Sequence, residues 1–128
     1  MERLDDGKRK AAALVAVAFA ARRVEPLDAL LVAVTAGELY GAGSALVEDA
    51  IEQPARYWSD LPAAGTSQAE IVGRLFRAAA AMGGVTARDV EMIRVLGGAV
   101  GLPEGVVGDL VARYRRVMEL DWDGEWVG

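Results

Sequence analysis

The sequence has 128 residues, of which 53% are hydrophobic and 26% charged, and this suits one globular domain with a single core. It contains no cysteine and no histidine, which excludes disulfides, thiolate sites, histidine-liganded metals and catalysis by Ser-His or Cys-His pairs. The net charge of −5 disfavours nucleic acid as a partner, because a negative surface repels phosphate backbones.

The first predicted helix is an alanine-rich run over residues 8 to 22. Alanine is the best helix former, and apolar residues cover nearly all faces of the run, which indicates a central helix surrounded by others. Within it, "AAALVAVAFAA" (residues 11 to 21) also has the character of a signal-peptide core, but it is too short to span a bilayer. The acidic residues before it favour the buried helix, so we expect a cytoplasmic protein that does not insert into membranes.

Two further helices are predicted before residue 53. Pro26 suits a first helical position, where its missing N–H is not needed. The apolar residues that then repeat at helical spacing are Leu27, Leu30, Leu31 and Val34. Ser44 is expected to cap a helix that ends at about Glu52.

Residues 53 to 66 are the one long irregular stretch, which Tyr57 and Trp58 are expected to anchor to the core. We therefore expect one domain over residues 1–128. Its parts are a first half over about residues 8–52, a linker over 53–66, a second half over 67–120 and an aromatic tail over 121–128.

The second half has clear helix boundaries. Ser67 and Glu70 form a capping-box pattern for a helix that ends near Met82, at the double glycine Gly83-Gly84. Thr86 is expected to cap the next helix, with Asp89 in its first turn.

Leu102-Pro103 opens the last long helix, whose inward residues are expected to be Val106, Val107, Leu110, Val111, Tyr114 and Met118. No stretch alternates like a strand for long. The prediction is an all-α fold, a compact bundle of about six helices.

Two segments repeat one pattern. "AARRVEPLDALLVAV" (residues 20 to 34) matches "AMGGVTARDVEMIRV" (residues 81 to 95) when Val24 is set against Val85, and Asp28 then falls against Asp89. Each segment reads as a helix, a corner and a second helix. Two such helix-corner-helix units can bury their apolar stripes against each other.

This layout, with "GGAVGLPEGVVGDLV" over residues 97 to 111, resembles the tellurite-resistance TerB-like family. The resemblance covers mainly residues 78–112. It implies a compact helical domain with two related halves, in a bacterial stress or defence system. Members of the family have been linked to metal binding through acidic residues at the hairpin corners.

The acidic corner position of that family falls here on Ala21 and Met82. Of the carboxylates, only Asp28 and Asp89 remain, each one helical turn inside its helix. A hard divalent ion needs several oxygen ligands at one point, so we expect no cofactor and keep a metal site at these two residues as an alternative.

Candidate partner-binding residues lie near the C-terminal end. "DWDGEW" (residues 121 to 126) presents Trp122 and Trp126, which either dock on the chain's own core or bind a partner, because Trp is a favoured interface anchor. Arg113 and Arg116 lie next to this tail, and Trp58 is a third tryptophan among the candidate partner-binding residues. Arginines clustered in this way either recognise acidic groups or form a solvated face.

Few residues suggest catalysis. Glu38, a carboxylate in a rather apolar helix, is the best candidate acid, and its alternative is an ordinary surface residue. The favoured interpretation is a non-enzymatic protein-interaction module that binds another protein, with a homodimer as a further option. The alternative is a carboxylate-based divalent-metal or small-ligand binding domain.

The glycines form another pattern, because they are spaced as small faces in the pairs Gly37 and Gly41, Gly97 and Gly101, and Gly105 and Gly108. A glycine inside a helix costs about 0.5–1 kcal/mol, so each needs a packing reason, either close helix approach or a cavity.

Overall fold

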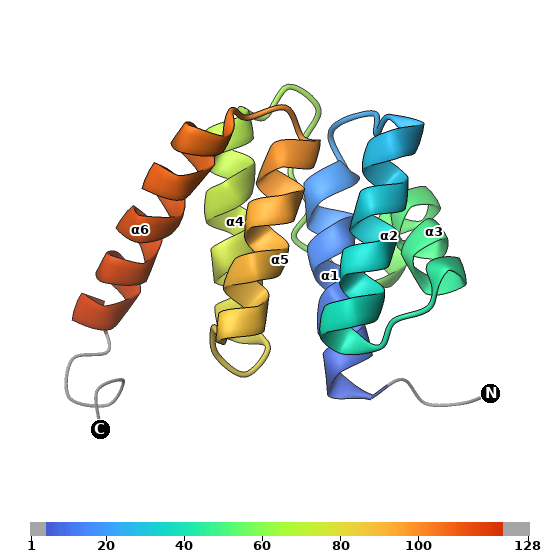
Figure 1. Cartoon of the computed structure of the whole chain (residues 1–128), viewed down its shortest axis with the longest axis horizontal. Coiled ribbons are helices and arrows are strands. Elements are labelled where there is room, and N and C mark those ends of the chain that lie inside the picture. Colours follow the sequence, from blue (N-terminus) through green and yellow to red (C-terminus); the bar gives the residue numbers. More distant parts are fainter. Residues whose placement is uncertain (1–4, 122–128) are drawn as a thin grey trace.

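The computed structural model describes residues 5–121, and for residues 118–121 it describes the backbone alone. Within this range the chain forms six α-helices and one short 3-10 helix with no strand, as the sequence predicts. These elements are α1 (Asp6–Phe19), α2 (Pro26–Tyr40), α3 (Ser44–Glu52), η1 (Pro54–Arg56), α4 (Gln68–Ala81), α5 (Ala87–Ala99) and α6 (Glu104–Asp121). Figure 1 shows the helices side by side, with α3 and α6 at opposite ends.

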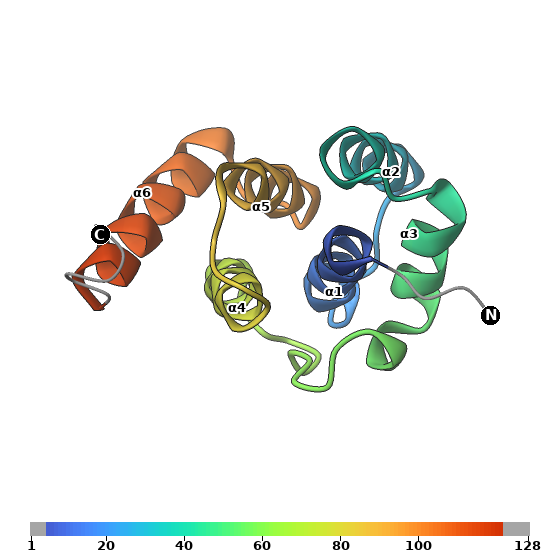
Figure 2. The ribbon, with the colours of Figure 1, turned by 90° about the horizontal axis from the view of Figure 1, so that it is seen from below.

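Helix α1 lies at the centre of the bundle. Every residue from Lys10 to Phe19 is buried, and α1 contacts α2, α3, α4 and α5 (Figure 2). Its alanines let the neighbouring helices approach closely, while Leu14, Val15 and Val17 fill the remaining space. The prediction of a central helix is confirmed, although the helix ends at Phe19 rather than at residue 22.

The two halves of the chain repeat one arrangement. The alignment of Val24 with Val85 also sets Pro26, the first residue of α2, against Ala87, the first residue of α5. Helix α3 packs on α1 and α2, and α6 packs on α4 and α5. The halves join where α2 lies against α5 and α1 against α4, which confirms a bundle built from two helix-corner-helix units (Figure 2).

The helix starts follow local capping chemistry. Thr86 and Asp89 form a complete capping box, in which the Thr86 N–H donates to Asp89 Oδ2 (2.9 Å) and the Asp89 N–H donates to Thr86 Oγ1 (3.4 Å). Ser67 Oγ accepts from the Glu70 N–H (3.2 Å). The expected cap at Ser44 is wrong: the extended backbone of Gly43 begins the helix, so Ser44 is already helical.

Four large apolar residues of α2 face outward. The core side of α2 consists of Val32, Ala36 and Tyr40, whereas Leu27, Leu30, Leu31 and Val34 are exposed. Helix α2 therefore packs on α1 and α5 through Val32, Ala36 and Tyr40, with Leu39 partly buried, and leaves the other three leucines on the surface.

Helix α6 packs through a single narrow stripe. Val107 and Val111 are buried, and Tyr114 stacks on Phe76 of α4 with ring centroids 5.4 Å apart. The expectation that Val106 faces inward is wrong, because α6 lies at the end of the bundle, contacts only α4 and α5, and leaves this side chain 41% exposed. The side chain of Met118 lies outside the described residues.

Adjacent glycines of α5 have opposite environments. A Cβ atom built on Gly97 would lie 3.0 and 3.1 Å from the two methyl carbons of Val107, so this glycine permits close approach of α5 and α6. A Cβ atom on Gly98 would meet no atom within 4 Å. The packing reason expected for helical glycines therefore holds at Gly97, but it is missing at Gly98 and also at Gly105 and Gly108 of α6, where a Cβ would likewise meet nothing within 4 Å.

We predict that Gly98→Ala raises the free energy of unfolding by about 0.5–1 kcal/mol, because it removes only the entropic cost of a helical glycine. Gly97→Ala should lower it by about 1 kcal/mol, since the buried, β-branched Val107 cannot move away cheaply. Urea titrations followed by circular dichroism measure both values. A Gly97→Ala protein more stable than Gly98→Ala would contradict the packing described.

Candidate functional site

A buried ion pair joins three helices at one corner of the bundle. Asp89 of α5 is fully buried and Lys10 of α1 is 5% exposed. Lys10 Nζ donates to Asp89 Oδ2 (2.7 Å) and to the carbonyl oxygen of Gly84 (2.8 Å). The Tyr40 hydroxyl, at the end of α2, donates to Asp89 Oδ1 (2.6 Å). We call these residues, with Thr86, the closed corner.

The closed corner controls the ionisation of its own members. Burial by itself raises the pKa of Asp89, but hydrogen bonds from Lys10, Tyr40 and Thr86 outweigh it and hold the pKa below its usual range. Burial, followed by the hydrogen bond to Asp89, raises the pKa of Tyr40 well above its ordinary value. Both oxygens of the carboxylate therefore have donors, and Asp89 stays charged at neutral pH.

The closed corner is suited to holding helices together rather than to chemistry. Its ammonium and carboxylate are buried, so a substrate would have no access to them. The guanidinium of Arg88 lies 4.8 Å from the centre of the Tyr40 ring, as a cation–π contact. The backbone of Gly83 and Gly84 has positive φ and ends α4. The carbonyl oxygen of Gly84 then accepts a hydrogen bond from the Lys10 ammonium of the same chain.

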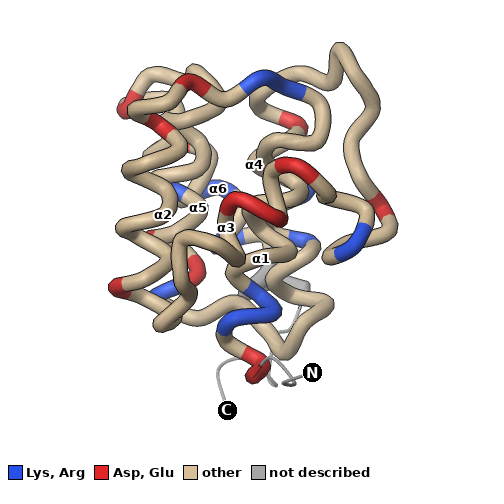
Figure 3. The backbone as a smooth tube through the Cα atoms, turned by 90° about the vertical axis from the view of Figure 1, so that its right-hand side faces the viewer, with Lys and Arg blue, Asp and Glu red and all other residues tan. Residues whose placement is uncertain are grey.

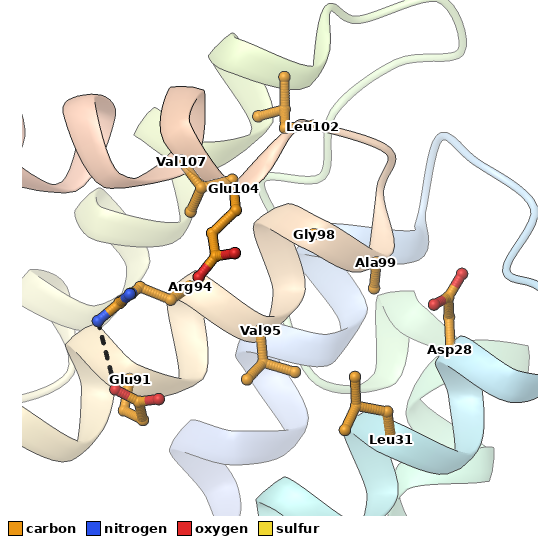
Figure 4. A pocket seen from close by; sticks show the side chains of 10 residues that line it. All are labelled: Asp28, Leu31, Glu91, Arg94, Val95, Gly98, Ala99, Leu102, Glu104 and Val107. Atoms are coloured by element: carbon orange, nitrogen blue, oxygen red, sulfur yellow. Dashed lines mark ion pairs between the residues drawn. The ribbon is translucent and has the colours of Figure 1, made fainter.

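An open groove lies at a second corner, between α2, α5 and the start of α6. Its volume is about 420 Å³. The residues that line it are Asp28, Leu31, Glu91, Arg94, Val95, Gly98, Ala99, Leu102, Glu104 and Val107. Figure 4 shows the apolar side chains of Leu31, Val95 and Ala99 between Asp28 on one side and Glu104 on the other. We call this feature the open groove.

An apolar stripe continues the open groove across α2. It consists of Leu27, Leu30, Leu31 and Val34, which are 80%, 61%, 51% and 49% exposed. Leu31 belongs to both features, so stripe and groove form one continuous surface. Figure 3 shows a long uncharged run of α2 between acidic positions near its two ends. We call these four residues the α2 stripe.

Of the partner residues predicted from sequence, the structure describes Arg113, Arg116 and Trp58. Arg113 and Arg116 line a shallow groove on α6 together with Asp109, Ala112 and Val117. Trp58 is partly buried against the core and follows η1, which packs on α1 and α3, away from α6. Trp122 and Trp126 lie outside the described residues.

The two predicted metal ligands lie at different corners. Asp89 pairs with Lys10 in the closed corner, while Asp28 lines the open groove. Among the residues that the structure describes, no three carboxylates come together in a way that could hold an ion. A metal at Asp89 would have to displace a buried ammonium, so the geometry gives this prediction no support.

Other polar residues have local roles. Arg94 lies near Glu91 on the surface, and the half-buried Arg74 lies near Glu70 and Asp60, with its buried Nε 3.4 Å from Glu70 Oε2 but without a hydrogen bond. Glu38 is exposed on α2. Tyr57 donates to Asp49, and its contact with the core confirms the predicted anchoring of the linker.

Sequence reasoning missed Lys10 and Tyr40 as partners of Asp89. The available signal was that Lys10, the last of three basic residues at the start of the helix, directly adjoins the apolar run, because a buried cation requires a carboxylate. Nothing in the spacing of Lys10, Tyr40 and Asp89 showed that they meet.

Comparisons of the chain with protein-family models, with curated proteins and with solved structures find no match. None of the helices that the structure describes combines the length and the hydropathy needed to cross a membrane.

We predict that Lys10→Met lowers the free energy of unfolding by about 3–5 kcal/mol, because it leaves a buried carboxylate without its counter-ion. Lys8→Met is the matched control. Lys8 approaches Asp5 only at 4.0 Å on the surface, so that substitution should change stability by less than about 0.5 kcal/mol. Equal losses in the two variants, measured by urea titration, would refute a special role for the buried pair.

We predict that Tyr40→Phe costs about 1.5–3 kcal/mol at neutral pH, because Asp89 Oδ1 loses its donor. The difference from the wild type should narrow below about pH 4, where unfolded Asp89 takes up a proton, because Tyr40 helps to depress the folded pKa of Asp89. It should also narrow above about pH 10, where Tyr40 ionises only in the unfolded chain. A pH-independent difference in thermal unfolding would rule out this linkage.

Proposed function

We propose that this chain is a non-enzymatic protein-interaction module whose docking surface is the α2 stripe together with the open groove. The observation that carries the proposal is the exposure of four large apolar side chains, between 49% and 80%, on one face of one helix. Single exposed leucines are normal on protein surfaces, but a continuous apolar patch is typical of an interaction site.

The energetics favour a covered surface. Each Å² of apolar surface removed from water contributes about 25 cal/mol, so burying several leucines in a partner yields several kcal/mol before the costs of association. The stripe also follows the spacing i, i+3, i+4, i+7, which presents a straight ridge to a partner.

A role in binding also agrees with where the reactive groups lie. In the described part of the chain, the buried charged residues are Lys10 and Asp89 of the closed corner, and they neutralise each other. Glu38, the candidate acid predicted from sequence, is exposed on α2. We extend the proposal, on the TerB-like resemblance, to a cytoplasmic bacterial protein of a stress or defence system.

The test is site-specific photo-crosslinking in cells that contain the protein naturally. A benzophenone amino acid at position 30 should form one discrete adduct with another protein, and the same probe at Glu48, an exposed residue of α3, should not. The captured protein, once purified, should bind the full chain directly. Leu27→Glu should then weaken binding at least about tenfold, as expected for an apolar hot spot.

Val117→Glu is the matched control, since Val117 is an exposed apolar residue of α6 beside Arg113 and Arg116. It should change the affinity less than about twofold. If Val117→Glu weakens binding and Leu27→Glu does not, the surface predicted around Arg113 and Arg116 carries the interaction. Adducts of equal yield at positions 30 and 48 would count against any docking role for α2.

A further inference from the structure

The two halves of the chain place equivalent carboxylates at two corners. The alignment that pairs Val24 with Val85 also pairs Asp28, in the first turn of α2, with Asp89, in the first turn of α5. Asp89 reaches Tyr40, the last residue of α2, and Asp28 shares the open groove with Ala99, the last residue of α5. Each carboxylate therefore lies where the other helix ends.

The surroundings of the two carboxylates differ. Asp89 has the Lys10 ammonium, one turn into α1, and the Tyr40 hydroxyl, just before the left-handed Gly41. Among the described residues, Asp28 has no equivalent lysine: α2 does not contact α4, and the one basic residue that lines the groove, Arg94, lies 3.9 Å from Glu91. Within residues 5–121, Asp28 makes no hydrogen bond or ion pair through its side chain.

We propose that the open groove receives a Lys or Arg side chain from an amphipathic helix of a partner protein, whose cation meets Asp28 as Lys10 meets Asp89. The apolar face of that helix lies on the α2 stripe. This inference rests on the proposed function and adds the chemistry of the partner.

The charges around the groove favour a cation. Asp28, Glu91 and Glu104 line it, and the one basic residue, Arg94, lies 3.9 Å from Glu91. Helix α2 itself contains no Lys or Arg. A partner with basic residues is attracted to this surface, and an acidic one is repelled.

The shape of the surface fits a helix. A partner helix with apolar residues at i, i+3, i+4 and i+7 matches the ridge of the α2 stripe, and a basic residue at the edge of its apolar face can enter the groove beside Leu31. Gly98, on the α5 side of the groove, leaves space because a Cβ there would meet nothing within 4 Å (Figure 4).

Two other occupants have the wrong charge. A second copy that packed α2 against α2 would bring Asp28 and Glu38 toward their own copies, and α2 supplies no cation to balance them. The chain's own residues 121–128 carry Asp121, Asp123 and Glu125, which have the same sign as the groove. A basic partner complements the surface better than either.

The experiment measures binding of a fluorescent synthetic helix of about 18 residues, with leucines at i, i+3, i+4 and i+7 and lysines elsewhere. A second helix carries glutamates in place of the lysines. Fluorescence anisotropy with the full chain, at about 0.15 M salt to screen distant charges, gives the Kd values. The lysine helix should bind at least about tenfold more tightly than the glutamate helix.

Matched variants locate the cation. Asp28→Asn and Glu48→Gln each remove one negative charge, but only the first is in the groove. Gly98→Leu fills the groove, whereas Gly108→Leu adds the same side chain to an equally open position on α6 outside it. Asp28→Asn and Gly98→Leu should raise the Kd of the lysine helix about tenfold, and the two controls less than about twofold.

The outcomes separate this inference from the proposed function. If Leu30→Glu abolishes binding of the lysine helix but Asp28→Asn does not, the assignment to Asp28 is wrong and the docking role of α2 stands. If Leu30→Glu also leaves the Kd unchanged, or if neither helix binds, the inference of a basic partner helix fails, and the crosslink at position 30 alone decides the docking role of α2.

Two more measurements test the other occupants. Sedimentation that shows a dimer of the wild type and a monomer of Leu30→Glu would assign the surface to a second copy. A gain of about tenfold in affinity on removal of residues 122–128 would assign the groove to the chain's own tail. Either result would overturn the inference.

Discussion

The burial of one ion pair constrains the arrangement of this bundle. Taking Lys10 and Asp89 out of water costs several kcal/mol for each ion, and the cost is offset only when each charged atom has its partners in good geometry. Those partners come from α1, from the end of α2 and from the corner before α5. Because a shift of any one helix would leave a buried charge unpaired, the pair fixes the relative register of all three.

Local sequence patterns predicted much of this fold, because helix boundaries are set by neighbouring residues. Pro26, the double glycine and the Thr86–Asp89 capping box each act within a few residues, and each lies at the expected helix end. The contact of Lys10 with Asp89 depends on residues far apart in sequence, so periodicity and spacing could not reveal it. The same limit applies to the open groove, which exists only once α2, α5 and α6 have packed.

Local sequence patterns also could not show whether the α2 stripe faces the core or the solvent. A stripe of three leucines and a valine at helical spacing usually faces a core, but here the core side of α2 is formed by Val32, Ala36 and Tyr40 instead. The leucines then remain on the surface together with the groove. Trp58 shows the reverse, since a residue that could have bound a partner instead packs partly against the chain's own core.

The two halves place stability and recognition at different corners of the bundle. In many proteins the same residues serve both. Substitutions in the closed corner remove or unpair a buried charge, so they change the stability of the fold. Substitutions around Asp28 act on a half-open surface, where this carboxylate has no hydrogen bond or ion pair to lose among the side chains that the structure describes. Substitutions near Asp28 can therefore change which partner is bound, while the closed corner keeps the fold unchanged. This separation makes the domain a good starting point for evolving new specificities.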